Sequence, residues 1–409
     1  MSLIINKIKN ADIYILPLAI FFVLISSAAT NLFVLLAVIL SVVHCVHKSN
    51  YLILFEKNIF KICFLIYLLL LISASYSFGS FEEIIGSLKK YIKFLYIPFI
   101  YYLIKIHKSE KLIINFFILG STIVLFLSYM KFYNIFDFSY VYDFLRNNNI
   151  ASPKEKIVSD MTSVFQNYII QGIVLSFYSF LCLYKAKEEN SYIYYLLSIL
   201  SLFNVLFLNN SRAAYIIIIL LLSLSFFIII KNNKVRIFSV IIIFSLIFTQ
   251  FGSNLENRVN NISQDINLIE TKNYKSSLGL RYIWAKIGLN NILERPLIGS
   301  GVGSYKFTSV TYLSNSDIND KEYFVTDNPH NELVNMSTQL GVVGSVFFLL
   351  FLLFLLKESA HVLTLGASFL IIIASIFNSA FYDNMLGLFL VIIIGLLYQN
   401  KINVKNEVF

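Results

Sequence analysis

Residues Ala213–Ile230 read AAYIIIILLLSLSFFIII, an uninterrupted apolar run without a charged side chain. A helix needs roughly 20 mostly apolar residues to cross the hydrocarbon core of a bilayer, and fewer if neighbouring helices shelter its ends. The whole chain has the same character, because 58% of its 409 residues are hydrophobic and only 13% are charged. A water-soluble fold cannot hide that much apolar surface. The sequence therefore predicts a membrane protein.

Similar apolar runs lie on both sides of this one. Counting them predicts an all-α polytopic membrane protein with about 12 transmembrane helices. One long polar segment, from about Phe251 to Leu340, interrupts the series and predicts a large, partly helical loop. The predicted spans are Asp12–Ser27, Asn31–His47, Phe60–Ser77, Tyr91–Ile106, Leu112–Phe132, Thr162–Tyr184, Ser191–Leu208, Ala213–Ile230, Val235–Phe251, Leu340–Leu356, Ser359–Phe377 and Asn384–Tyr398.

The basic residues indicate which loops share a side of the membrane. Lys and Arg outnumber Asp and Glu, 32 against 23, which could suggest a nucleic-acid partner. They cluster, however, in alternate short loops, and this is the pattern that sets orientation in a bilayer. With an even number of spans it places both termini in the cytoplasm, and the long polar segment then faces outward. We expect membrane lipids as surroundings and no nucleic acid as partner.

The predicted domain organisation has three parts. Residues 1–251 form transmembrane helices 1–9 with short loops, residues 252–339 form the large outer loop with the candidate catalytic residues, and residues 340–409 form helices 10–12 and a cytoplasmic tail. Within the loop, apolar residues recur at helical spacing over Leu280–Leu293, and a second helix is predicted after Pro329. Phe78–Lys93 alternates apolar and charged residues as a helix lying in the membrane interface does.

Three outward-facing side chains are candidates for chemistry. His330 is the only histidine of the outward segments, and an imidazole that titrates near neutrality can take a proton from an attacking hydroxyl. Arg281 presents a planar fork of donors that matches a phosphate. Arg212 is predicted at the outer mouth of a span, where a cation is costly without a partner. The structural alternatives are a helix-capping histidine, a solvated charge and an interfacial anchor, respectively.

Other features are weaker signals. Lys90 and Lys93 could contact an anionic headgroup, although a generic lipid contact is the simpler reading, and Asn331 is a further candidate for substrate binding. The glycine-rich stretch Gly299–Gly303 resembles a phosphate-cradling loop, but no Gly-Lys-Ser/Thr follows it, so a tight turn is expected. No metal site is predicted, because no second His or Cys lies at ligand spacing from His330. The three cysteines are predicted to be buried thiols without disulfides.

The order and spacing of these motifs resemble those of the O-antigen ligase family, a group that also includes O-antigen polymerases and related lipid-linked glycan transferases. The resemblance covers roughly the second half of the chain, and the first half is similar only in being a set of spans. Ala213 stands where the family often has glycine, which leaves the neighbouring charge in place. The matching residues are Ser211-Arg-Ala, Arg281-Tyr-Ile-Trp284, Arg295-Pro-Leu-Ile-Gly-Ser-Gly-Val-Gly303, Pro329-His-Asn331 and Gln339-Leu-Gly-Val-Val-Gly344.

The resemblance implies glycosyl transfer without nucleotide, metal or other cofactor. The donor would be a glycan on undecaprenyl diphosphate, and the acceptor of a ligase would be a sugar hydroxyl of lipid A–core. The enzyme would be a multi-pass protein of the bacterial inner membrane with its active site facing the periplasm. His330 would act as general base, and Arg281 and Arg212 would bind the diphosphate and stabilise the charge that it gains as it leaves.

Three other functions are weighed against this one. An O-antigen polymerase needs the same diphosphate clamp and base, although a single dominant outer loop favours the ligase. Transfer of glycan onto protein is a third possibility, but such chains are often longer. A transporter or flippase would carry charged residues along a pathway inside its spans, and the predicted spans are almost free of charge.

Overall fold

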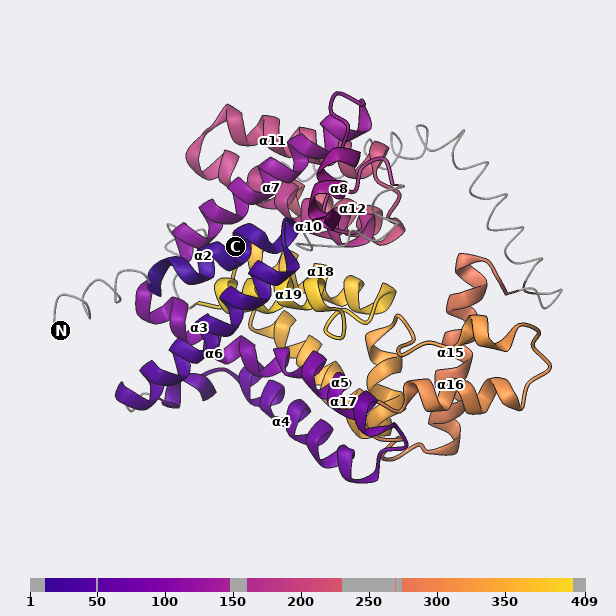
Figure 1. Ribbon diagram of the computed structural model, residues 1–409. Coiled ribbons are helices and arrows are strands. Elements are labelled where there is room, and N and C mark those ends of the chain that lie inside the picture. The colour runs from indigo at the N-terminus through magenta and orange to yellow at the C-terminus, as the bar shows by residue number, and fades with distance from the viewer. Residues whose placement is uncertain (1–11, 49–50, 148–159, 230–268, 270–273, 400–409) are drawn as a thin grey trace.

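The computed structural model describes residues 12–48, 51–147, 160–229, 269 and 274–399, and within these all regular elements are helices (Figure 1). Short 3-10 and π turns extend several of them. The α-helices are α2 (Ile15–Phe21), α3 (Ser27–Lys48), α4 (Asn58–Ser73), α5 (Phe81–Tyr91), α6 (Lys93–His107), α7 (Glu110–Phe132), α8 (Ser139–Asn147), α10 (Tyr168–Glu189), α11 (Tyr192–Phe203), α12 (Arg212–Ile229), α15 (Ser277–Glu294), α16 (Tyr305–Ser314), α17 (Glu332–Lys357), α18 (Val362–Phe377) and α19 (Asn384–Leu397).

The helices follow the predicted apolar runs closely. Every predicted span contains a helix except Val235–Phe251, which lies outside the described residues. Five of the described helices, α3, α4, α7, α10 and α17, are long and apolar enough to cross a membrane. Shorter apolar helices cover Asp12–Leu24, Tyr192–Leu208, Arg212–Ser225, Val362–Phe377 and Asn384–Leu397. The all-helical class is therefore confirmed, and the five candidate spans support a membrane protein. The count of 12 spans, the outward orientation of the loop and the three-part division stay predictions.

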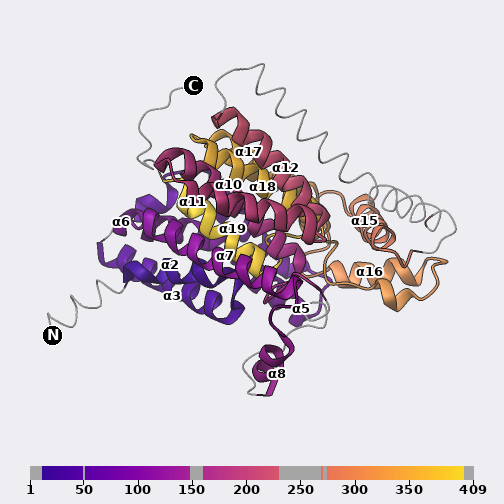
Figure 2. The ribbon, with the colours of Figure 1, turned by 90° about the horizontal axis from the view of Figure 1, so that it is seen from above.

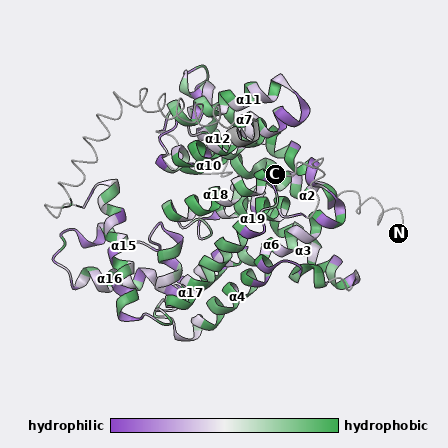
Figure 3. Cartoon of the chain, turned by 180° about the vertical axis from the view of Figure 1, so that it is seen from behind, coloured by the Kyte–Doolittle hydropathy of each residue, from purple (hydrophilic) through white to green (hydrophobic). Residues whose placement is uncertain are grey.

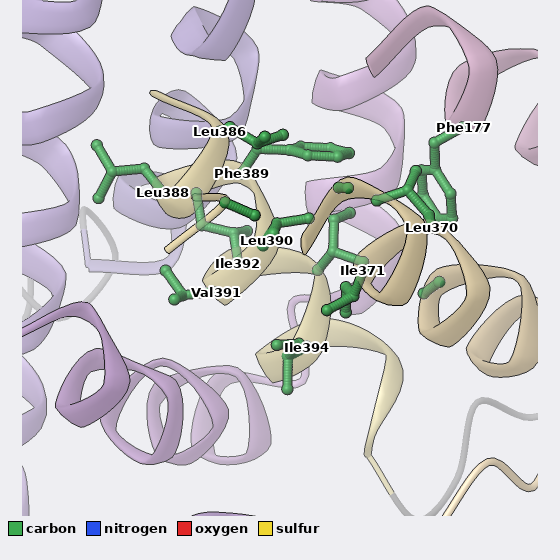
Figure 4. Packing of buried hydrophobic residues seen from close by; sticks show 14 of the residues in the cluster. Phe177, Leu370, Ile371, Leu386, Leu388, Phe389, Leu390, Val391, Ile392 and Ile394 are labelled. Carbon is green, nitrogen blue, oxygen red and sulfur yellow. The ribbon is translucent and has the colours of Figure 1, made fainter. Parts of the chain in front are cut away.

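The core of the bundle surrounds α19. Every residue from Met385 to Leu397 is buried, and a helix that is apolar on all sides is stable only when neighbours enclose it. Helices α6, α18 and α10 supply these neighbours. Figure 4 shows Phe389 of α19 near Phe177 of α10 and Leu370 of α18. The cysteines Cys45, Cys63 and Cys182 are buried and unpaired, as predicted.

Helices α15 and α16 have a small core of their own. Ile283 and Ile287 of α15 pack with Tyr305 of α16 and with Phe324 from the following connection. This part projects from one side of the bundle (Figures 1 and 2), and Figure 3 shows more hydrophilic residues along it than along the bundle helices. α15 covers the predicted helix Leu280–Leu293 with a few residues added at its start, where the Ser276 hydroxyl accepts the Gly279 N–H.

Helix α17 joins the projecting part to the bundle and bends where it does so. Gly341 has φ 64° and ψ −151° inside this helix, a conformation that costs little only for glycine. At this bend the helix meets the turn that follows Pro296, because the Val342 N–H donates to the Pro296 carbonyl at 2.7 Å. A Cβ on Gly341 would lie 2.5 Å from the Leu297 carbonyl. The glycine therefore lets the two backbones touch.

The glycine-rich stretch is a packing turn, as expected. The amide N–H of Ser300 donates to the Thr338 carbonyl, and that of Gly301 to the Gln339 carbonyl, both at 2.9 Å. The Gly303 N–H donates to the Gln339 side chain at 3.0 Å. Since these donors are used within the protein, they are not available to cradle a phosphate.

Helix α5 packs against the glycine-rich turn, in addition to being amphipathic as a helix in a membrane interface is. Its first residues form a capping box, in which Ser80 and Glu83 each bond the other's backbone N–H. Glu83 also pairs with Lys306 of α16 at 3.4 Å. The predicted amphipathic helix is thus present and joined to α16, and its depth in a membrane remains a prediction.

Candidate functional site

His330 sits on a strained bend directly before α17. Its φ is 52°, a left-handed value that is uncommon for a residue with a side chain and that costs about 1–3 kcal/mol when the surroundings impose it. The Asn328 side chain accepts the His330 N–H at 3.0 Å, and Asn331 caps α17 by accepting the Val334 N–H at 3.0 Å. The backbone on both sides of the histidine is therefore fixed.

The ring of His330 contacts two distant parts of the chain. Its Nδ1 lies 3.2 Å from Oδ1 of Asn378, 48 residues later, at the end of α18. A carbonyl oxygen can only accept, so this contact places the proton of the neutral ring on Nδ1 and the lone pair on Nε2. The ring also packs against Trp284 of α15, with 4.9 Å between centroids. These two contacts orient the imidazole as a base acting through Nε2 requires.

Trp284 connects the histidine to the arginines. Its indole N–H donates to the Phe324 carbonyl at 3.0 Å, and its own carbonyl accepts the Tyr305 hydroxyl at 2.6 Å. Arg281 lies three residues earlier on the same helix, and residues at this spacing share a helix face. The tryptophan thus joins the histidine to the helix that carries Arg281.

Arg281 and Arg212 are brought within range of each other's charge. Burial lowers the pKa of Arg281, the charge of Arg212 lowers it further, and Tyr168 acts in the opposite direction. A guanidinium nevertheless stays charged at physiological pH. Among the ion pairs of the described residues, none involves either arginine. Two cations held together in this way create a site of positive potential for an anion.

The turn before Arg212 is rigid. Asn209 is buried, and it accepts the Ser211 N–H at 2.7 Å and donates to the Tyr168 carbonyl at 3.0 Å. Ser211 caps α12 by accepting the Ala214 N–H at 3.2 Å. Arg212 is therefore the exposed first residue of α12. The start of a helix carries a partial positive charge, which adds to the attraction for an anion there.

The stretch that carries these three residues can be compared with known proteins. Residues 196–349 match the O-antigen ligase family. This stretch contains Arg212, Arg281 and His330, and the resemblance noted in the sequence is confirmed. A 122-residue stretch is also 25% identical to a Rickettsia conorii protein named as a polysaccharide ligase, and it covers 30% of this chain and 28% of that protein. The two comparisons support a ligase- or polymerase-type function.

The remaining predicted residues of this O-antigen ligase-like chain differ in what they can contact. Lys93 is buried, and its ammonium donates to the Asp383 carbonyl. Asn331 uses its amide nitrogen on the Ile376 carbonyl at 2.9 Å, and its oxygen caps α17. Both therefore have contacts within the protein, and their part in substrate binding stays a prediction. Lys90 is half-buried, with its ammonium 3.8 Å from the Tyr382 ring centroid, and faces a cleft.

Sequence reasoning missed two groups that position the site, and both depend on residues outside the matched stretch. One is Asn378, the partner of the His330 ring. The other is centred on Glu332, which is buried and accepts the Tyr91 hydroxyl at 2.8 Å and the N–H groups of Phe381 at 2.7 Å and Tyr382 at 3.3 Å. Glu332 stands among mostly polar residues in the sequence, so nothing local marked it as buried, and its partners come from distant parts of the chain.

One group of possible metal ligands occurs among the described residues, away from the histidine. Asp12, His44 and His107 bring their ligand atoms within 4.8 Å of one another. His107 ends α6, about 21 Å along the helix from Lys93 at 1.5 Å per residue. The group therefore lies at the opposite end of α6 from Lys93, and the expectation that the transfer needs no metal stays a prediction.

Proposed function

We propose that this protein is an O-antigen ligase. It transfers a glycan from undecaprenyl diphosphate to a sugar hydroxyl of lipid A–core, at the periplasmic face of the bacterial inner membrane. The observation that carries the proposal is the pair Arg212 and Arg281, two guanidinium groups without a carboxylate partner among the described ion pairs, within charge range of each other. Bringing like charges together is unfavourable unless an anion joins them, and a diphosphate is such an anion.

The reaction follows from these groups as a direct displacement. The acceptor hydroxyl oxygen forms a bond to the anomeric carbon, the bond from that carbon to the diphosphate oxygen breaks, and the electron pair leaves with the diphosphate. His330 takes the hydroxyl proton on Nε2. A single displacement inverts the anomeric centre.

The physical demands on the protein are modest. A diphosphate is already a good leaving group, so orientation and a cationic clamp supply most of the acceleration. The two arginines form the cationic clamp at the place where negative charge develops. A positioned general base adds typically about 10²–10⁴-fold. A sugar hydroxyl loses its proton as it attacks, so a neutral imidazole is a sufficient base. The mechanism uses neither a nucleotide nor a metal ion.

The proposal is tested by deleting the gene and separating the surface glycolipids on a gel. Loss of a ligase leaves bare lipid A–core and accumulated lipid-linked polymer. Loss of an O-antigen polymerase instead leaves core that carries one repeat. Complementation with His330→Ala should restore the protein to the membrane but not the glycan, because the base is absent. Normal glycan attachment by His330→Ala would contradict the assigned base.

A further inference from the structure

A polar cleft opens beside the candidate catalytic histidine. It has a volume of about 280 Å³, at the small end of the range for ligand pockets. Its lining combines helix α5, the glycine-rich turn, α16 and two connections near His330. The charged and aromatic residues that line it are Glu82, Glu83, Lys90, Lys306, Asp327 and Tyr382. A cleft of this size fits one sugar unit rather than a whole oligosaccharide.

The charges of the cleft differ from those of the two-arginine site. Three carboxylates face two ammonium groups, so a diphosphate would be repelled by at least as much charge as attracts it. Burial acts to raise the pKa of Glu83, but hydrogen bonds from Ser80 and the charge of Lys306 outweigh it, and the pKa is lowered. This carboxylate is therefore ionised. A neutral polyol is suited to such a lining, because each hydroxyl can both donate to a carboxylate and accept from an ammonium group.

Two short segments connect the cleft to His330. Asp327 lines the cleft three residues before the histidine. In the second segment, Asn378 contacts the imidazole and Tyr382 lines the cleft four residues later. Glu332 holds the second segment in place through the N–H of Tyr382 at 3.3 Å. The histidine is therefore linked to the cleft through these two segments, and through Trp284 to α15, the helix that carries Arg281.

We propose that this cleft binds the acceptor sugar, the ring whose hydroxyl attacks the donor. The inference rests on the proposed transferase function and adds the substrate that this part of the site takes. The diphosphate end of the donor occupies the arginine side, the acceptor enters through the mixed-charge cleft, and the imidazole receives the proton between them. The same sugar chemistry could come from lipid A–core or from a lipid-linked repeat, and we commit to lipid A–core.

The test uses the full-length protein with a glycan on undecaprenyl diphosphate as donor and lipid A–core as acceptor, each titrated separately. Asp327→Asn and Glu82→Gln each remove one charged acceptor from an exposed position. We expect the acceptor KM to rise roughly tenfold or more, as loss of a charge-assisted hydrogen bond does, with the donor KM within about twofold of wild type. Lys89→Gln is the matched control, because Lys89 is an exposed neighbour of Lys90 on α5 and does not line the cleft.

The outcomes separate this inference from the proposed function. Cleft variants that raise only the donor KM, or that match Lys89→Gln in both constants, overturn the inference while the ligase stands. If the wild type transfers nothing to lipid A–core, the ligase assignment fails.

In that case, saturation-transfer NMR decides whether the cleft binds a sugar. The two ligands are delipidated core oligosaccharide and a lipid-linked repeat. A sugar-binding cleft is supported if either sugar binds and if this binding is lost in Asp327→Asn but kept in Lys89→Gln. If only the repeat binds, the sugar that the cleft takes is that of the polymerase substrate. Binding that Asp327→Asn leaves unchanged, or no binding by the wild type, overturns it.

Discussion

Replacing Asn378 by aspartate tests how His330 is prepared to act as a base. The Asn378 oxygen lies 3.2 Å from Nδ1 of the ring, so Asn378→Asp places a negative charge against the imidazole. An opposite charge at this range stabilises the imidazolium and raises its pKa by about 1–3. Since only the neutral ring accepts a proton, the acidic limb of the pH–rate profile should move upward by at least about one pH unit.

The magnitude depends on the pH at which the rate is measured. If the acidic limb moves up by one pH unit, the rate of the variant at a given pH on that limb is about tenfold lower than that of wild type. At higher pH, where the ring is neutral, the variant reaches the same plateau. Asn378→Ala behaves differently, because it removes a neutral hydrogen bond worth about 0.5–1.5 kcal/mol. That loss corresponds to a decrease of about 2–10-fold at every pH, with the limb in its original place.

The assay follows initial rates of glycan transfer by the purified protein between about pH 5 and 9, the range in which a histidine titrates. Wild type, Asn378→Asp and Asn378→Ala are compared as kcat/KM for the acceptor. Thermal unfolding in the same detergent serves as the control for an intact fold. A profile for Asn378→Asp that coincides with that of wild type, in protein of equal stability, refutes the role given to this contact and to Nε2 as the base.

Two further predictions address the clamp and the bend. Arg281→Lys should lower kcat/KM by about 10²-fold, because a point charge replaces the planar fork. The control is Lys286→Gln on the exposed face of the same helix, whose kcat/KM should stay near that of wild type. Equal rates for the two variants would remove Arg281 from the mechanism. Gly341→Ala should reduce the free energy of unfolding by about 1–3 kcal/mol, since its Cβ would meet the Leu297 carbonyl at 2.5 Å. Its control is Gly86→Ala on α5, where a Cβ meets nothing within 4 Å. Thermal unfolding of both variants is the measurement. An unchanged free energy of unfolding for Gly341→Ala would show that α17 and the turn at Leu297 can separate.

The helices could be predicted from the sequence because their signals are local. Apolar length marks the bundle helices, and the 3.6-residue period of α15 predicted Leu280–Leu293 within the observed Ser277–Glu294. The bend at Gly341 was not predicted, although the glycine was visible. Its cause is the approach of a turn some 40 residues earlier in the chain, and a contact of that kind leaves no periodic signal.

The candidate site was predictable only where charge makes a residue conspicuous. His330 and the two arginines stand out because an ionisable group near an apolar run needs a reason. Asn378 lies in a short loop, Asn378–Asp383, that is notable in the sequence only for its lack of basic residues. A neutral amide carries no electrostatic cost that would single it out, so its contact with the imidazole appears only in the fold. Lys93 is the opposite case. Its charge made it conspicuous as a contact for an anionic headgroup, whereas in the fold the lysine is buried and its ammonium donates to the Asp383 carbonyl.

The proposed direct displacement would impose a geometric condition that agrees with the asymmetry around His330. The attacking oxygen and the leaving oxygen lie on opposite sides of the anomeric carbon, so an inverting transferase needs two subsites that face each other across one point. The leaving side must favour accumulating negative charge, which the Arg212 and Arg281 pair does. The attacking side must hold a neutral hydroxyl near a base without attracting the diphosphate, and the mixed charges of the cleft beside Asp327 meet that condition. A site with arginines on both sides would bind the donor in either direction and lose this order.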